Sequence, residues 1–225
     1  MPFVFDAYGT LLDVESAARE AAQEPGMEAL SGIWPILAAG WRERQLRYSW
    51  LCSMMQRYDD FWEITKRALE ATLEDHNLSH DKKIKARLLA LYSALSAYDE
   101  VPEVLATLST RSASMAVLSN AAPAMLKTAI SAAGIDNWFD ALISVDSLKT
   151  YKPTPAVYQL VLDKYGCTAG DVVFFSSNNW DVSGAGAFGF KTVWVNRAGV
   201  TWDKLPGQPD HIAGSLHEAY RLLMA

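Results

Sequence analysis

The sequence has little of what disulfide-bonded, metal-bound or membrane-spanning proteins need. Its 225 residues include only two cysteines, Cys52 and Cys167, and four histidines. Two distant cysteines cannot supply a disulfide framework or a zinc site, and the histidines show no metal-ligand spacing. No apolar run approaches the roughly 18 residues of a spanning helix, and no secretory signal precedes the first apolar segment. We expect a soluble, cytoplasmic protein with packed thiols and no membrane partner.

Basic residues are also in short supply. Lysine and arginine total 20 against 26 acidic residues, which gives a formal net charge of −6 at pH 7. That balance argues against a nucleic-acid partner, and an anionic substrate would need a local basic pocket. Half of the residues are hydrophobic and a fifth are charged, which is an ordinary globular composition. The length is enough to bury a substantial core.

Two kinds of pattern alternate along the chain. Residues 14–98 are helical in pattern, with apolar side chains at the spacing of Phe61, Thr65, Leu69 and Leu73. Elsewhere short apolar runs predict strands over Phe3–Asp6, Ser114–Ser119, Ala141–Val145, Val172–Ser176 and Thr192–Val195. Helices are predicted between the later strands, over 124–133, 155–165 and 182–188. Alternating strands and helices favour a parallel sheet.

These patterns predict an α/β fold with a doubly wound parallel-sheet core. The core comprises residues 1–13 and 99–225, and residues 14–98 form a helical cap subdomain inserted after the first strand, over the carboxyl edge of the sheet. Asp13 and Asp81 are expected to cap helices, and Gly134 and Gly166 to end them. Residues 198–210 are expected to form a loop.

Polar residues follow four of the expected strands. In chain order they are Asp6, Ser119-Asn120, Lys152-Pro153 and the run from Ser176 to Asp181. Each alone has an ordinary explanation, because aspartate forms turns and Ser-Asn caps helices. Parallel strands place their carboxyl ends at one edge of the sheet, where open α/β sheets bind ligands. The four together therefore predict a chemical site at that edge.

The order of these residues resembles the four motifs of the haloacid dehalogenase superfamily. Closer similarity is to its L-2-haloacid dehalogenases, over essentially the whole chain. The segments that carry the resemblance are Asp6-Ala-Tyr-Gly-Thr10, Trp41-Arg42, Ser119-Asn120, Tyr151-Lys152-Pro153 and Ser176-Ser-Asn-Asn-Trp-Asp181. The last is the most specific of them.

Tyr8 separates this chain from the phosphatases of the same superfamily. Those enzymes carry a second aspartate two residues after the nucleophile, and a tyrosine cannot act as that acid near neutral pH. Ser177 stands where the first of their two magnesium-binding acids falls, and magnesium prefers carboxylate oxygens. Asp6, Asp181 and a substrate carboxylate make three negative charges, which Lys152 and Arg42 offset in part without a metal. We expect no cofactor and no metal.

The resemblance implies a nucleophilic role for Asp6, which displaces halide from carbon and forms an ester that water hydrolyses. It implies that Arg42 and Asn120 stabilise the halide, and that Ser119 and the amides near Ala7 and Tyr8 hold the substrate carboxylate. Further residues would orient the nucleophile and the water: Thr10, Lys152, Ser176, Asn178 and Asp181. The side chains expected to wall a dry pocket are Tyr8, Leu46, Phe61 and Trp180. The substrate would be a short L-2-haloalkanoic acid, and the product a 2-hydroxy acid inverted at C2.

Several alternatives stay open at this point. Arg42 lies in the charged run Arg42-Glu43-Arg44, which is also typical of a solvated helix face. Phe61 and Trp180 could equally be ordinary core aromatics. Glu43 stands where relatives often carry glutamine, and it could either alter the substrate range or face solvent. The other functions considered are a magnesium-dependent phosphatase or phosphonatase and a non-catalytic carboxylate-binding protein. The resemblance further implies a homodimer.

Overall fold

A parallel sheet organises the molecule. The computed structural model describes residues 1–111 and 114–224, and within them six strands form one sheet in the order β3-β2-β1-β4-β5-β6. Every neighbouring pair is parallel. The strands are β1 (Phe3–Phe5), β2 (Met115–Ser119), β3 (Ala141–Ser144), β4 (Val173–Ser176), β5 (Lys191–Val195) and β6 (His211–Ala213). The α/β parallel-sheet prediction is confirmed.

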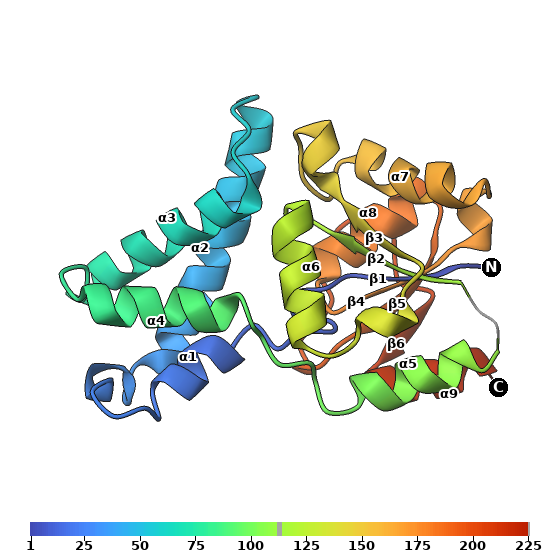
Figure 1. The fold of residues 1–225 in the computed structure, drawn as a ribbon. Helices are drawn as coiled ribbons and strands as arrows, with labels where there is room; N and C mark the ends of the chain where they lie inside the picture. The colour runs from blue at the N-terminus through green and yellow to red at the C-terminus, as the bar shows by residue number, and fades with distance from the viewer. Residues whose placement is uncertain (112–113, 225) are drawn as a thin grey trace.

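Helices cover both faces of this sheet. Figure 1 shows α7 (Pro155–Tyr165) and α8 (Asn179–Phe188) on one side, and α5 (Val101–Ser109) and α9 (Leu216–Met224) on the other. The helix α6 (Pro123–Ala132) packs against β3. Residues of β1, β2 and β4 are buried throughout, which is why these strands read as unbroken apolar runs.

The strand predictions differ from the structure at one place. The five expected strands lie within one residue of the observed ones at each end. The sixth, β6, was not predicted. It is a three-residue edge strand with two exposed residues, His211 and Ile212, so it has neither the length nor the buried run of the others. The expected loop over 198–210 leads directly into it.

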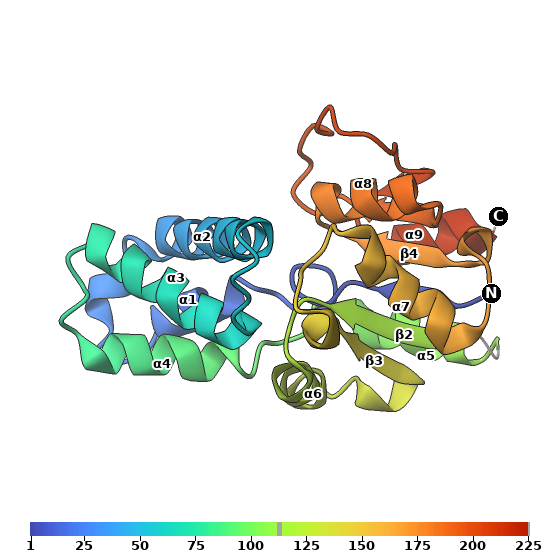
Figure 2. The same cartoon turned by 90° about the horizontal axis from the view of Figure 1, so that it is seen from above.

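The helices α1 to α4 fall between β1 and β2 in chain order, and together we call them the helical unit. They are α1 (Ser16–Ala21), α2 (Trp34–Met54), α3 (Phe61–Asp75) and α4 (Lys82–Tyr92). Figures 1 and 2 both show the helical unit beside the sheet rather than on either of its faces. Within the described part of the chain, no helix is long and apolar enough to cross a membrane.

One long buried stripe defines α2. The side chains of Leu37, Trp41, Gln45, Ser49 and Cys52 are buried at intervals of three or four residues, the spacing that places them on one helix face. That face packs along α3. Because Gln45 and Ser49 are polar, the stripe also carries hydrogen-bonding groups into the interior of the helical unit.

Most helix ends follow the expected signals. Asp81 caps α4 through its carboxylate, which accepts from the backbone nitrogens of Lys83 and Ile84. Gly134 and Gly166 adopt the left-handed conformation just after α6 and α7. The helix α8 begins at Asn179, three residues before the expected start, and Asn178 at its N-cap position makes no capping hydrogen bond with its side chain.

The Asp13 prediction was wrong. The N-cap residue of α1 is Glu15, whose side chain makes no capping hydrogen bond. Asp13 instead lies two residues earlier, where its carboxylate accepts from the backbone nitrogen of Glu15 and pairs with Arg19 at 2.7 Å. An aspartate just before a helix looks the same in sequence whether it is the N-cap residue or lies two residues before the N-cap.

Two adjacent linkers join the helical unit to the sheet. Leu12 and Ala97 form an antiparallel bridge, and the backbone nitrogen of Tyr98 donates to the carbonyl of Leu11 at 3.0 Å. Farther along, the Tyr58 hydroxyl donates to Asp146 at 2.5 Å and so ties the loop between α2 and α3 to the segment after β3. The helical unit thus contacts the sheet region at its linkers and at its tip.

A glycine in α8 provides a test of this packing. A Cβ added at Gly184 would lie 2.5 Å from the Pro153 Cβ and 2.6 Å from the Tyr158 hydroxyl oxygen. Since overpacking typically destabilises by about 1–3 kcal/mol, Gly184→Ala should lower the free energy of unfolding in urea by that amount. The control is Gly170→Ala, because a Cβ there meets nothing within 4 Å. Equal stability of the two variants would contradict the close approach.

Candidate active site

The carboxyl ends of the strands and the helical unit enclose a small cavity of about 10 Å³. Its lining residues are Asp6, Tyr8, Arg42, Leu46, Phe61, Ser119, Asn120 and Trp180. All of them were predicted as site residues. Thr10, Lys152 and Asn178 contact Asp6 directly, whereas Ser176 and Asp181 connect to it through Asn178 and Lys152. The predicted set therefore converges on one place.

Asp6 follows β1, the strand between β2 and β4 where the strand order switches direction. Its carboxylate accepts three hydrogen bonds, from the Thr10 hydroxyl at 2.9 Å, the Asn178 amide at 2.9 Å and the Lys152 ammonium at 3.0 Å. The turn that returns Thr10 to Asp6 passes through Gly9 at φ +89°, a region that L side chains rarely adopt. Asp6 is held in one orientation and faces the cavity.

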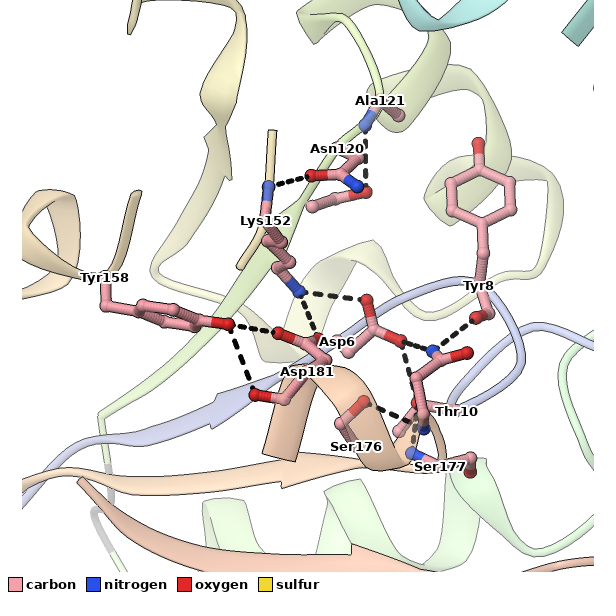
Figure 3. A network of polar contacts seen from close by, with 12 residues as sticks. Asp6, Tyr8, Thr10, Asn120, Ala121, Lys152, Tyr158, Ser176, Ser177 and Asp181 are labelled. Atoms are coloured by element: carbon pink, nitrogen blue, oxygen red, sulfur yellow. Dashed lines mark hydrogen bonds and ion pairs between the residues drawn. The ribbon is translucent and has the colours of Figure 1, made fainter. Parts of the chain in front are cut away.

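Lys152 lies between two carboxylates. Its Nζ is 3.0 Å from Asp6 Oδ1 and 2.7 Å from Asp181 Oδ2, and its side chain is 1% exposed. Figure 3 shows the ammonium pointing between the two groups. Burial alone would lower the pKa of Lys152, but the two carboxylates outweigh burial and raise it above its ordinary value. Lys152 is therefore charged at neutral pH.

Asp181 is fully buried in the first turn of α8. Its Oδ1 accepts a hydrogen bond from the Tyr158 hydroxyl at 2.8 Å. Burial, with a smaller contribution from Asp6, raises the pKa of Asp181 to about 6, although Lys152 and Tyr158 act in the opposite direction. Asp181 is therefore ionised at neutral pH. It supplies one of the two negative charges that flank Lys152.

Arg42 reaches the site from α2 and does not lie on a solvated helix face. Its Nη2 donates to the Tyr8 carbonyl at 3.2 Å and lies 3.5 Å from Asn178 Oδ1. Its Nη1 donates to Gln45 at 2.8 Å. Glu43, by contrast, is exposed and pairs with Arg47 at 3.1 Å. The solvent-facing interpretation therefore holds for Glu43 and fails for Arg42.

Buried polar groups fix the remaining side chains. Asn120 Oδ1 accepts from the Lys152 backbone nitrogen at 2.9 Å, which sets the direction of the Asn120 amide. The Ser119 hydroxyl accepts from the Ala121 backbone nitrogen at 3.2 Å, and the Ser176 hydroxyl from that of Asn178 at 3.1 Å. These hydrogen bonds place Ser119 and Asn120 at the cavity wall and Ser176 behind it.

Aromatic rings form the apolar part of the wall. Tyr8 stacks on Tyr92 with ring centroids 5.8 Å apart, and Phe61 lies 6.4 Å from Tyr8. Trp180 meets Trp50 edge-on at 5.4 Å. Phe61 also belongs to the buried hydrophobic core that runs through the molecule, so this residue lies both in the core and at the cavity wall. An enclosure of this kind keeps water from the polar groups inside it.

The interior residues Tyr158, Gln45 and Tyr92 were not predicted as part of the site. Tyr158 donates to Asp181, and Gln45 accepts from Arg42. Gln45 also donates to the Thr65 hydroxyl at 2.6 Å and accepts from the Tyr92 hydroxyl at 3.1 Å. The position of Gln45 three residues after Arg42 places both on one side of α2, and that spacing was a usable signal. Tyr158 and Tyr92 carry no such signal, because ordinary core tyrosines look the same in sequence.

The acids here are arranged around an ammonium. In the described ranges 1–111 and 114–224, no group of three or more histidine, cysteine, aspartate or glutamate side chains is placed to hold a metal ion. Asp6 and Asp181 each direct an oxygen at Lys152. The charges of Asp6, Asp181, Lys152 and Arg42 sum to zero before any ligand binds.

Comparison with known proteins places this geometry in a family. The profile of the haloacid dehalogenase-like hydrolases matches residues 3–189. A curated relative, (S)-2-haloacid dehalogenase 4A of Burkholderia cepacia, is 43% identical over 98% of this chain and 93% of its own length. A solved dehalogenase structure with an intermediate complex has a TM-score of 0.92 and 41% identity, covering 98% of this chain and 96% of that one.

A second solved structure of the same fold contains a covalently bound ligand. It is the L-2-haloacid dehalogenase of Xanthobacter autotrophicus with chloropropionic acid covalently bound, at 34% identity and a TM-score of 0.86 over 100% of this chain and 98% of that one. These similarities extend over nearly the full length of both partners. The chain belongs to the haloacid dehalogenase-like hydrolase family.

Proposed function

We propose that this protein hydrolyses short-chain L-2-haloalkanoic acids to 2-hydroxyalkanoic acids and halide, without a metal. The observation that carries the proposal is the Asp6 carboxylate, held by three donors at the wall of a cavity that Arg42 and Asn120 also line. The names of the relatives agree with it, because the Burkholderia protein is an (S)-2-haloacid dehalogenase. The covalent chloropropionic acid in the Xanthobacter structure supports an ester intermediate.

In the first step, an oxygen of Asp6 attacks C2 of the substrate opposite the halogen. The carbon–halogen bond breaks, the halide leaves with the bonding electrons, and C2 is inverted as the aspartyl ester forms. Arg42 and the Asn120 amide stabilise the charge on the leaving halide. Ser119 and the backbone amides near Ala7 and Tyr8 bind the substrate carboxylate, which fixes the reacting carbon in line with Asp6.

In the second step, water attacks the ester carbonyl carbon of Asp6. The bond from this carbon to the ester oxygen, which Asp6 contributed in the first step, breaks. One proton of the water goes to that oxygen as the 2-hydroxy acid leaves, the other proton is released to solvent, and Asp6 regains a carboxylate that contains the oxygen of the water. Lys152 and Asn178 donate to the two carboxylate oxygens of Asp6, so they stabilise the negative charge that develops there. Asp181 keeps Lys152 charged and in place, and Ser176 and Thr10 orient the surrounding groups.

Substrate entry requires movement. A cavity of about 10 Å³ is close to the minimum for a single water and smaller than any haloacid. We infer that residues 14–98 act as a cap that shifts against a core of residues 1–13 and 99–225. Arg42 belongs to the cap and Asp6 to the core, so closure assembles the site around the substrate.

Assembly and location are part of the same proposal. The side chains of Leu51, Met54 and Met55 are exposed near the end of α2, with Met54 72% exposed, and such apolar surface favours association. We infer a homodimer that uses this helix. Cys52 and Cys167 are free thiols, as expected of a protein that works in the reducing cytoplasm.

The proposal is tested by halide release from L- and D-2-chloropropionate, with and without EDTA. We expect chloride and the inverted 2-hydroxy acid from the L enantiomer only, at a rate that EDTA leaves unchanged. Asp6→Asn should form no ester detectable by mass spectrometry. Activity that EDTA abolishes, with turnover of p-nitrophenyl phosphate, would favour the phosphatase. Binding of haloacid without any ester would indicate a carboxylate-binding protein.

Arg42 can be tested against a neighbour on its own helix. Removing one preorganised donor to developing charge costs roughly 10²–10³-fold in rate, so Arg42→Ala should lower kcat for chloride release by about that factor. Arg47→Ala is the control, since Arg47 pairs with Glu43 on the exposed face of α2. A loss of only a few-fold in Arg42→Ala would remove the role in halide stabilisation.

The buried pair Tyr158–Asp181 predicts a pH profile. Asp181, with its pKa raised to about 6 by burial, is ionised above that pH and protonated below it. Because protonation frees Lys152 from one of its partners, kcat/KM should fall as the pH drops through about 6. The hydrogen bond from Tyr158 lowers the pKa of Asp181, so Tyr158→Phe should move this acidic limb to higher pH.

The matched control is Tyr165→Phe. Tyr165 lies at the end of the same helix, and its buried hydroxyl has no partner among the described residues. The pH–rate profile of this variant should coincide with that of the unmodified protein. If both substitutions move the limb equally, Tyr158 does not act through Asp181.

A further inference from the structure

Arg197 occupies a partly buried junction outside the cavity, just after β5. Its Nη2 donates to the Thr10 carbonyl at 2.8 Å, and its Nη1 pairs with Glu100 at 2.5 Å. Its guanidinium carbon lies 3.8 Å from the centre of the Tyr98 ring. The side chain therefore joins the loop that follows Asp6 to the second linker of the helical unit and to the start of α5.

We propose that Arg197 is a positioning residue for the reaction at Asp6, acting through Thr10, and that the same side chain holds the second linker of the helical unit in place. The inference rests on the proposed function and assigns to it a residue outside the pocket. Arg197 touches neither the cavity nor Asp6, so its effect has to pass through the backbone that it holds.

Thr10 transmits the position of Arg197 to the nucleophile. The Thr10 hydroxyl donates to Asp6 Oδ2 at 2.9 Å and accepts from the Ser177 backbone nitrogen at 2.9 Å. Its carbonyl accepts from Arg197. Thr10 is thus held from two sides, and a shift of its backbone would move the hydroxyl that orients the Asp6 carboxylate.

The second linker is fixed by the same guanidinium. Tyr98 lies against its face, and the Tyr98 backbone nitrogen donates to the Leu11 carbonyl at 3.0 Å. Glu100 is the N-cap residue of α5 and also lies near the Leu216 backbone nitrogen. Burial alone would raise the pKa of Glu100, but the hydrogen bond from Arg197 lowers it overall, so the pair is ionic at neutral pH.

Geometry, rather than charge, is what Arg197 supplies. Its positive charge is paired with Glu100, so the ion pair adds little net field at Asp6. A guanidinium donates in two directions in its plane while it stacks on an aromatic ring, and an ammonium cannot reproduce all three contacts. A lysine would keep the charge but lose this arrangement. The Arg197→Lys variant therefore separates an effect of geometry from an effect of charge.

The test compares Arg197→Lys and Arg197→Gln with the control Arg87→Lys. Arg87 forms a similar ion pair with Glu24 within the helical unit, away from the cavity. Because small misplacements of a reacting group can cost up to about 10²-fold, we expect both Arg197 variants to lose roughly 10- to 100-fold in kcat and in the single-turnover rate of ester formation. KM for L-2-chloropropionate should stay within about threefold, as expected when ground-state binding is retained.

A second measurement separates positioning from stability. Arg197→Ala should regain ester formation when guanidinium is added at a concentration that leaves the circular dichroism spectrum unchanged, and Arg87→Ala should show no such response. If Arg197→Gln does not fold, Arg197→Lys carries the comparison alone. Folded Arg197→Lys with the single-turnover rate of the unmodified protein would overturn the inference. Unmodified protein that forms no ester would overturn the proposed function as well.

Discussion

The ion triad of Asp6, Lys152 and Asp181 is the interaction on which the rest of the site depends. An ammonium removed from water loses a large hydration free energy, which only close and well-oriented partners can offset. Here Lys152 has two carboxylates within 3.0 Å and a backbone that hydrogen-bonds to Asn120. Removing Lys152 would leave two buried carboxylates without their common counter-ion, and removing either carboxylate would leave Lys152 with a single partner. The triad therefore ties the ends of β1 and β4 to the segment after β3.

The fold could be predicted because a parallel sheet buried on both sides leaves a plain signal. The residues of β1, β2 and β4 are buried throughout and apolar up to the serine that ends β2 and β4, and further polar residues follow each strand. That rule alone places Asp6, Asn120 and Ser176 at one edge. Lys152 was expected to follow a strand directly as well, but it lies eight residues after the end of β3 at Ser144, with a 3-10 helix over Val145–Leu148 between them.

What sequence reasoning missed consists of contacts between segments that are distant in the chain. Tyr158 and Arg197 each donate a hydrogen bond to a residue more than twenty positions away, and a buried tyrosine or a loop arginine has no local pattern that reveals its partner. Arg42 could be assigned only from the family resemblance, because its charged neighbours are typical of a solvated helix. The short edge strand β6 was missed for the opposite reason, since too few of its residues are buried to form a pattern.

The adjacent linkers of the helical unit have a consequence for how such proteins diversify. Leu12 and Ala97 are joined by a backbone bridge, so the segment between them leaves and re-enters the sheet region at nearly one point. A segment with neighbouring ends can be lengthened, shortened or exchanged without changing the path of the chain through the sheet. Arg42 would be exchanged with it, while Asp6, Lys152 and Asp181 would stay. Asp6 and Arg42 therefore lie on separately inheritable parts of the chain, so that the charge which the helical unit brings to the cavity can change while the carboxylates and Lys152 beneath it are kept.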